Sequence, residues 1–127
     1  MILTYAWVAL GGALGSMARF GMANAVAALT GPAFPWGTLG INIIGSFVIG
    51  WFFAVTGPGG RFDVAPDARI FVMVGICGGF TTFSSFSLQT LQLIQDGQMA
   101  RAGSYILGSV VLCLLFVWFG WLLGFAR

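Results

Sequence analysis

Long uncharged, apolar runs dominate this chain and limit what it can fold into. Charged side chains are absent from residues 1–18, 20–60, 70–95 and 102–126. A helix needs about 20 mostly apolar residues to cross a bilayer. Charged residues make up only 6% of the chain, against roughly 25% in soluble domains. The composition predicts an integral membrane protein and excludes most soluble enzymes and nucleic-acid binders, so we expect neither enzymatic activity nor a nucleic-acid partner.

These runs predict four helices, although the helices do not match the runs one to one. The first helix continues past Arg19 into the second run. The run over residues 20–60 is too long for one helix, and a turn cluster of glycine, threonine and prolines at residues 30–35 divides it. We therefore expect transmembrane helices over about residues 3–28, 36–55, 70–95 and 102–125. The N-terminus lacks the positive region of a cleaved signal peptide and is assigned to the first helix. Little chain is left for loops, so residues 1–127 are predicted to form a single all-α transmembrane domain.

The few charges give almost no preference for one orientation in the membrane. With four helices, both termini and the loop at residues 56–69 share one side. That side carries Arg61, Arg69 and Arg127, and the other carries Arg19 and Arg101. This is a weak bias under the positive-inside rule. Dual topology, with an antiparallel homodimer as its product, follows as a hypothesis.

The third predicted helix carries an unusual polar sequence near its middle. Gly78 and Gly79 precede five hydroxyl residues between Thr81 and Ser87. One interpretation is a continuous helix whose hydroxyls bond back to the preceding turn. The other is a broken helix, which lipid tolerates only where the freed backbone is buried or lines a cavity. A break would expose carbonyl oxygens of residues 78–81 to a small hard cation.

Aromatic side chains are interleaved with these hydroxyls. Phe80, Phe83 and Phe86 recur every three residues and share one side of a helix. Such stripes are usually core or lipid-facing surface. Because the edges of aromatic rings carry partial positive charge, ring edges beside hydroxyl donors also suit a small anion that must shed its water.

Three further polar features lie within the predicted spans, each with two interpretations. Asn42 can bond between helices or line a polar pathway. Tyr105, Ser109 and Cys113 lie at i, i+4 and i+8 on one face, as a wet track or as packing. Arg19 can extend to the headgroups or raise the anion potential of a vestibule.

Titratable groups are missing where coupled transport needs them. The chain has no Glu or His, and Asp63, Asp67 and Asp96 fall in loops or at helix ends. A proton-coupled exporter normally needs an intramembrane titratable group. This disfavours a small dual-topology multidrug exporter. A non-transporting membrane scaffold would explain the glycines but not residues 80–87, so passive conduction fits best.

Three motifs together resemble a known family, the Fluc (CrcB) fluoride channels of bacteria. They are GGALGSMARF at residues 11–20, GTLGINIIG at residues 37–45 and GICGGFTTFSSFS at residues 75–87. The resemblance covers nearly the whole chain. It implies a fluoride-selective channel that exports fluoride passively across the bacterial inner membrane and relieves fluoride toxicity. It also implies an antiparallel homodimer with two pores and a structural sodium ion at the dimer interface.

The resemblance also assigns roles to individual residues. The pore residues would be Phe83, Phe86, Asn42, Ser84, Ser109, Tyr105 and Thr38; Arg19 would lie at a vestibule; and the backbone carbonyls of Gly78 and Thr81 would hold sodium. One departure is Cys113, where the family often has serine. A thiol is a weaker hydrogen-bond donor than a hydroxyl.

Overall fold

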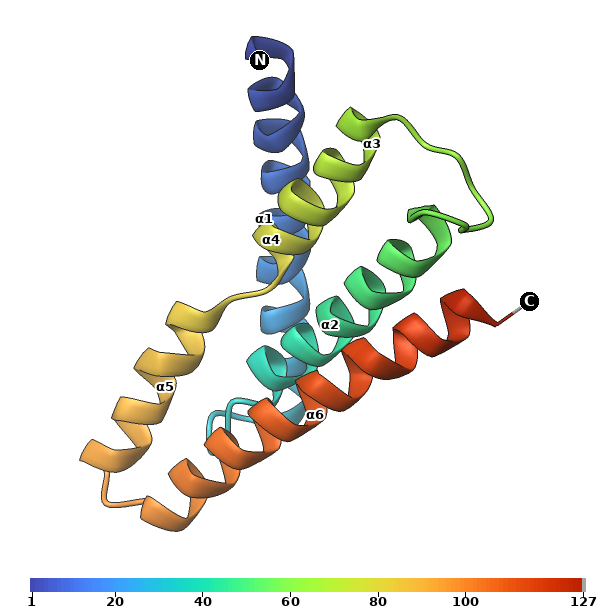
Figure 1. Cartoon of the computed structure of the whole chain (residues 1–127). Coiled ribbons are helices and arrows are strands. Elements are labelled where there is room, and N and C mark those ends of the chain that lie inside the picture. The colour runs from blue at the N-terminus through green and yellow to red at the C-terminus, as the bar shows by residue number, and fades with distance from the viewer. Residues whose placement is uncertain (127) are drawn as a thin grey trace.

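The computed structural model describes residues 1–126, and within that range every regular element is a helix (Figure 1). The elements are α1 (Ile2–Thr30), α2 (Trp36–Thr56), α3 (Pro66–Ile70), the π-helix η1 (Phe71–Cys77), α4 (Gly78–Phe80), α5 (Phe83–Gln95) and α6 (Met99–Phe125). The coarse prediction of an all-α chain is confirmed. Helices α1, α2 and α6 coincide with three of the predicted helices, and their ends differ by at most three residues from the predicted ones.

The largest difference in boundaries lies at the start of the third helical segment. It begins at Pro66 instead of residue 70. Proline is favoured at the first helical position because its missing N–H is not needed there. Asp67 follows in the first turn, where a negative charge favours the helix dipole. The loop before it is correspondingly shorter than predicted.

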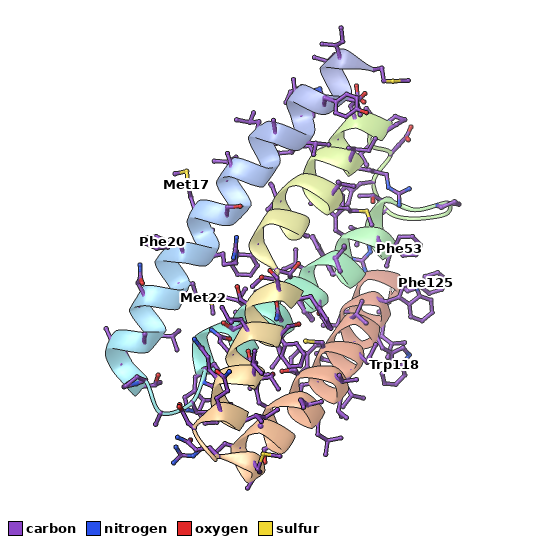
Figure 2. All side chains as sticks on the ribbon, turned by 90° about the vertical axis from the view of Figure 1, so that its left-hand side faces the viewer. Met17, Phe20, Met22, Phe53, Trp118 and Phe125 are labelled. Carbon is purple, nitrogen blue, oxygen red and sulfur yellow. The ribbon has the colours of Figure 1, made fainter. Side chains whose placement is uncertain are left out.

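Among the described residues 1–126, three helical segments are long and apolar enough to cross a membrane: Trp36–Thr56, Pro66–Gln95 and Met99–Phe125. Large apolar side chains point outward from the molecule, among them Phe20 on α1, Phe53 on α2 and Trp118 on α6 (Figure 2). Their exposed fractions are 71%, 48% and 57%. Apolar surface on this scale belongs against lipid or protein, which indicates a multi-pass membrane protein.

The third helical segment, residues 66–95, packs against one helix along its first half and against another along its second half. Elements α3, η1 and α4 pack against α1, whereas α5 packs against α6. Figure 1 shows the extended link between α4 and α5 at which the chain changes direction. Helices α2 and α6 lie side by side along their lengths in both views. The buried cluster of Leu39, Phe86, Leu93, Ala102 and Tyr105 joins α2, α5 and α6.

Glycines permit the close approach of the main helices. A Cβ atom on Gly15 of α1 would overlap with the carbonyl oxygen of Ile76. A Cβ atom on Gly120 of α6 would overlap with the carbonyl oxygen of Phe47 on α2. Small residues let helix backbones meet in this way inside membranes, where lipid removes the hydrophobic drive between helices. The expectation that Gly11 and Gly15 form a packing face is confirmed, since both are buried against η1 and α4.

The contact between Gly120 and Phe47 predicts that alanine substitution at two glycines of α6 has very different effects on the stability of the fold. Gly120→Ala should destabilise the folded chain by about 1–3 kcal/mol, because the added methyl group has no room. Gly108→Ala is the matched control, since nothing lies within 4 Å of the position that its methyl group would take. Thermal unfolding in detergent should show a clear loss for Gly120→Ala alone. Equal melting temperatures for the two variants would contradict close packing of α2 and α6 at Gly120.

Candidate functional site

The extended link between α4 and α5 is held by a side chain of α2. Thr81 (φ −80°, ψ 157°) and Thr82 (φ −153°, ψ 113°) both leave the helical conformation. The backbone N–H of Thr82 donates to Asn42 Oδ1 at 2.8 Å, and Asn42 Nδ2 donates to the carbonyl oxygen of Thr82 at 3.1 Å. One amide side chain therefore satisfies both backbone polar groups of Thr82.

Hydroxyl groups complete the ends of the two helices at the link. The hydroxyl of Thr82 caps α5 by accepting a hydrogen bond from Ser85 N at 3.2 Å, and it donates to Ser85 Oγ at 3.0 Å. Threonine is a favoured residue at this N-cap position. On the other side, Thr81 N and Thr81 Oγ1 donate to the carbonyl oxygen of Cys77 at 3.0 and 2.8 Å. Of the hydroxyl residues in this sequence, Thr82 caps α5, whereas Thr81 and Ser87 bond back to the carbonyl groups four residues earlier.

These contacts divert the donors that two carbonyl groups would have in a continuous helix. The oxygen of Gly78 would accept from Thr82 N, which instead donates to Asn42. The oxygen of Thr81 would accept from Ser85 N, which instead donates to the Thr82 hydroxyl. Gly78 is exposed on the chain surface and Thr81 is half-buried. Both carbonyls are thereby left without the partner that helical geometry normally gives them.

Arg19 reaches the same region from α1. Its Nε donates to the carbonyl oxygen of Gly79 at 3.1 Å, and Ser16 Oγ lies 3.4 Å from the same oxygen. The side chain that the sequence assigned to a vestibule is therefore bonded to the helix end just before the link. Its vestibule role stays a prediction.

Beside the link lies a hollow of about 440 Å³ between α2, the third segment and α6. Its lining combines aromatic, amide, hydroxyl and thiol groups with apolar side chains. It includes Asn42, Gly45, Ser46, Met73, Cys77, Gly78, Thr81, Thr82, Phe83, Phe86, Ser109 and Cys113. Six of the ten residues to which the resemblance assigned a role thus meet around one hollow, together with Cys113: Asn42, Gly78, Thr81, Phe83, Phe86 and Ser109. We call this space the central cavity.

Ser109 is the most distinctive group in the central cavity. Its side chain is only 7% exposed, and its hydroxyl has no hydrogen-bond partner among the residues that the structure describes. A buried unsatisfied hydroxyl costs about 1–3 kcal/mol. Native structures rarely retain such a group unless water or a ligand pairs with it. The hydroxyl of Ser109 is therefore available to donate a hydrogen bond to a bound ligand or water.

The two phenylalanines of the central cavity occupy different environments. Phe86 is buried and meets the ring of Tyr105 nearly edge-on, at 5.0 Å between centroids and 75° between planes. Phe83 is 76% exposed and lies 5.3 Å from Phe86. An aromatic edge presents partial positive charge to whatever it faces. Phe83 reaches the surface of the chain, where a neighbouring molecule or lipid can cover it.

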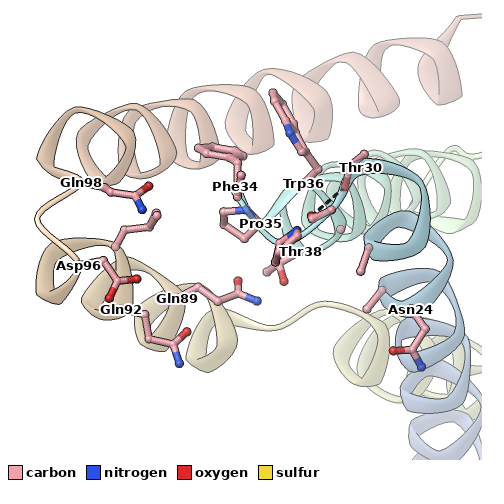
Figure 3. A pocket seen from close by; sticks show the side chains of 17 residues that line it. Asn24, Thr30, Phe34, Pro35, Trp36, Thr38, Gln89, Gln92, Asp96 and Gln98 are labelled. Atoms are coloured by element: carbon pink, nitrogen blue, oxygen red, sulfur yellow. Dashed lines mark hydrogen bonds between the residues drawn. The ribbon is translucent and has the colours of Figure 1, made fainter.

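A second hollow of about 460 Å³ opens at one end of the molecule (Figure 3). Its polar lining comprises Asn24, Thr30, Thr38, Gln89, Gln92, Asp96 and Gln98. We call it the polar hollow. Figure 3 shows Gln89 of α5 extending toward Thr38 across this space. Thr38, one of the predicted pore residues, therefore lines this hollow and not the central cavity.

Tyr105 lines neither hollow but contacts residues of both. It is fully buried; its hydroxyl donates to Gln89 Oε1 at 2.8 Å, while its ring packs on Phe86 and on Phe34. Gln89 and Phe34 line the polar hollow, and Phe86 lines the central cavity. Ser84 lies apart from both hollows: it is exposed, with its hydroxyl 3.4 Å from that of Thr82.

Sequence reasoning missed two polar groups of this region. Gln89 follows Phe86 by three residues, so helical spacing places it on the same side of α5; that spacing was the available signal. Ser46 follows Asn42 by one turn of α2 and lines the central cavity. Neither residue belongs to the conspicuous glycine and hydroxyl sequence that drew attention to the third segment.

Comparisons with known proteins point to one family. Residues 6–121 match the family described as CrcB-like protein, Camphor Resistance (CrcB). A protein of Methylocella silvestris named fluoride-specific ion channel FluC is 58% identical to this chain. The similarity covers 93% of this chain and 90% of the length of that protein. Proteins with the same name from Opitutus terrae and Rhodospirillum rubrum are 57% and 56% identical, over 91% and 93% of this chain and 88% and 92% of theirs. The resemblance carried by the three sequence motifs is confirmed, and the chain belongs to the Fluc (CrcB) family.

Proposed function

We propose that this chain forms a fluoride-selective channel that conducts fluoride passively across the bacterial inner membrane. One observation carries the proposal. The buried hydroxyl of Ser109 has no hydrogen-bond partner among the described residues, and it lies in a cavity that Asn42, Phe83 and Phe86 also line. The relatives named above as fluoride-specific ion channels support the same conclusion.

The chemistry of the central cavity suits fluoride. Fluoride holds water tightly, so a selective path must replace its hydration with several short contacts. The Ser109 hydroxyl is a donor, the Asn42 amide has one N–H beyond the one that bonds Thr82, and the edges of Phe83 and Phe86 carry partial positive charge. None of these groups titrates. The larger chloride ion fits such a narrow set of donors poorly.

The polar hollow serves as an entrance to this path. Its amides and hydroxyls keep an ion hydrated on the way in. Tyr105 would act between the two hollows, because it contacts Gln89 of the polar hollow and Phe86 of the central cavity. Ser84 would act near the outer surface of the pore, and Arg19 would raise the anion potential at a vestibule.

Passive conduction follows from where the acidic residues lie. Asp63 is in the loop before α3, Asp67 is in the first turn of α3, and Asp96 directly follows α5. All three acidic residues of the chain therefore lie in a loop or at an end of an apolar segment. A proton-coupled exporter needs a carboxylate within the membrane, so a channel is favoured over an exporter.

The active unit of the proposal is an antiparallel, dual-topology homodimer with two pores. In it α1 would cross the membrane as a fourth span beside the three apolar segments. Phe83 and the outer faces of α1 and α6 leave large apolar areas that lipid and a second copy would cover. The weak bias among the five arginines is compatible with insertion in both directions.

A sodium ion at the dimer interface would complete the assembly. The carbonyl groups of Gly78 and Thr81 fit this ion, since hard cations take oxygen ligands and unwound backbone in membrane helices supplies them. Their usual helical donors are bonded elsewhere, and Gly78 is exposed where a second copy can approach. The ion would join the two copies.

The first test is ion efflux from liposomes that contain the purified protein, with fluoride and chloride run side by side. We expect rapid fluoride efflux, negligible chloride efflux and no dependence on a pH gradient, because the chain has no Glu or His and its three aspartates lie in a loop or at the ends of the apolar segments. Efflux that requires a proton gradient would favour an exporter. Absence of any efflux from verified, folded dimers would favour a scaffold.

Replacement of the cavity phenylalanine tests the role of the ring edge. Phe86→Ile keeps an apolar side chain but removes the aromatic edge, so fluoride flux should fall by about tenfold or more, which corresponds to ~1.4 kcal/mol of lost barrier stabilisation. The dimer should remain intact by size-exclusion chromatography. Phe83→Ile is the companion variant. Unchanged flux in both would remove the ring edges from the mechanism.

The half-buried thiol of Cys113 gives an independent test of the pore location. Methyl methanethiosulfonate should form a mixed disulfide with Cys113, releasing methanesulfinate, and should reduce fluoride flux by narrowing the central cavity. Cys113→Ser should conduct and be protected from the reagent. Cys77 is only 3% exposed and should react slowly. Full flux after demonstrated modification of Cys113 would show that ions pass elsewhere.

A further inference from the structure

We infer that Asn42 is a positioning residue: its side-chain amide holds the backbone of Thr82 extended and thereby sets where α5 begins. The inference rests on the proposed function for its consequence, because α5 carries Phe83 and Phe86 into the central cavity. The hydrogen bonds themselves do not depend on what the cavity conducts.

The two contacts leave no ambiguity in the orientation of the amide. A backbone N–H can only donate and a backbone carbonyl can only accept. Asn42 Oδ1 must therefore face Thr82 N, at 2.8 Å, and Asn42 Nδ2 must face Thr82 O, at 3.1 Å. Matching both groups takes a donor and an acceptor at a fixed separation in one planar group. Asparagine provides this, whereas aspartate lacks the donor and alanine lacks both.

The membrane makes this pairing necessary. A backbone group that leaves a helix at membrane depth needs another partner, because lipid offers none. Thr82 lies between α4 and α5, far from either end of the 66–95 segment. Asn42, forty residues away on α2, supplies partners for both of its backbone groups. Without Asn42 these backbone groups would be paired either by forming a continuous helix or by the entry of water.

The start of α5 in turn sets the geometry of the cavity. Phe83 is the first residue of α5, and Phe86 follows one turn later against Tyr105. If the helix ran on through Thr82, both rings would turn away from their present positions relative to Ser109. The Asn42 side chain thus has two roles. Its bonds to Thr82 hold the link, and its remaining N–H can donate a hydrogen bond into the central cavity.

Hydrogen–deuterium exchange of the full-length protein in nanodiscs tests the inference. Asn42→Ala should make the amides of residues 82–85 exchange about tenfold faster or more, as expected for the loss of two hydrogen bonds. Peptides from α2 and α6 should be unchanged. Ser46→Ala is the matched control, since Ser46 lies one turn along α2 and lines the same cavity, and its exchange pattern should equal that of the unmodified protein. Unchanged exchange at residues 82–85 in Asn42→Ala overturns the inference, whatever happens to flux.

Asn42→Asp separates positioning from the electrostatics of the pore. Aspartate keeps an acceptor for Thr82 N, so the Thr82 amide should stay more protected than in Asn42→Ala. Its negative charge should still suppress fluoride flux. If Asn42→Asp and Asn42→Ala expose the Thr82 amide equally, the bond between Oδ1 and Thr82 N does not hold the link.

A measurement on the unmodified protein covers the case in which the variants fail to fold. The chain has two asparagines, Asn24 and Asn42, so selective ¹⁵N-asparagine labelling gives two side-chain amide signals. Asn24 is exposed and serves as the internal reference. The Asn42 amide should exchange with water much more slowly than that of Asn24. Equal rates would refute the inference, while fluoride efflux by the same preparation reports separately on the proposed function.

Discussion

Backbone N–H and carbonyl groups inside a bilayer need a partner that lipid does not offer, and this requirement governs the architecture at Thr81 and Thr82. The chain leaves helical geometry there, yet the polar groups of Thr82 are paired with Asn42, and the next helix is capped by the Thr82 hydroxyl. Because partners exist, the third segment can change direction within the apolar region. The position of the central cavity depends on that change.

Close helix packing gives the link a rigid setting. Gly15 lets α1 approach η1 and α4, and Gly120 lets α6 approach α2, in each case to within the space of one methyl group. The third segment therefore belongs to the α1 side before the link and to the α6 side after it. Since helices in lipid lack a hydrophobic drive to associate, such contacts are where small changes in side-chain volume have large effects.

The chemistry around the cavity is neutral but directional. Hydroxyl, amide and aromatic-edge groups all present partial positive charge without a titratable side chain, so their attraction for an anion does not switch with protonation. Tyr105 contacts Phe86 of this cavity on one side and Gln89 of the polar hollow on the other. In the proposed channel, a small, strongly hydrated anion would exchange its water for these donors in steps.

The sequence alone determined that the chain is helical and apolar enough to cross a membrane, because helix length and hydrophobicity are local properties read residue by residue. It also determined which motifs carry the polar groups, and the helix ends fell within a few residues. Tertiary structure alone decided how those groups combine. That Asn42 pairs with Thr82 depends on a contact across forty residues, which no local spacing encodes. That Ser109 has its hydroxyl buried in the central cavity, while Thr38 lines the polar hollow and Ser84 lies outside both, depends on how the helices rotate against one another. Side-chain volume and close backbone contact set that rotation, and they act only once the helices have met.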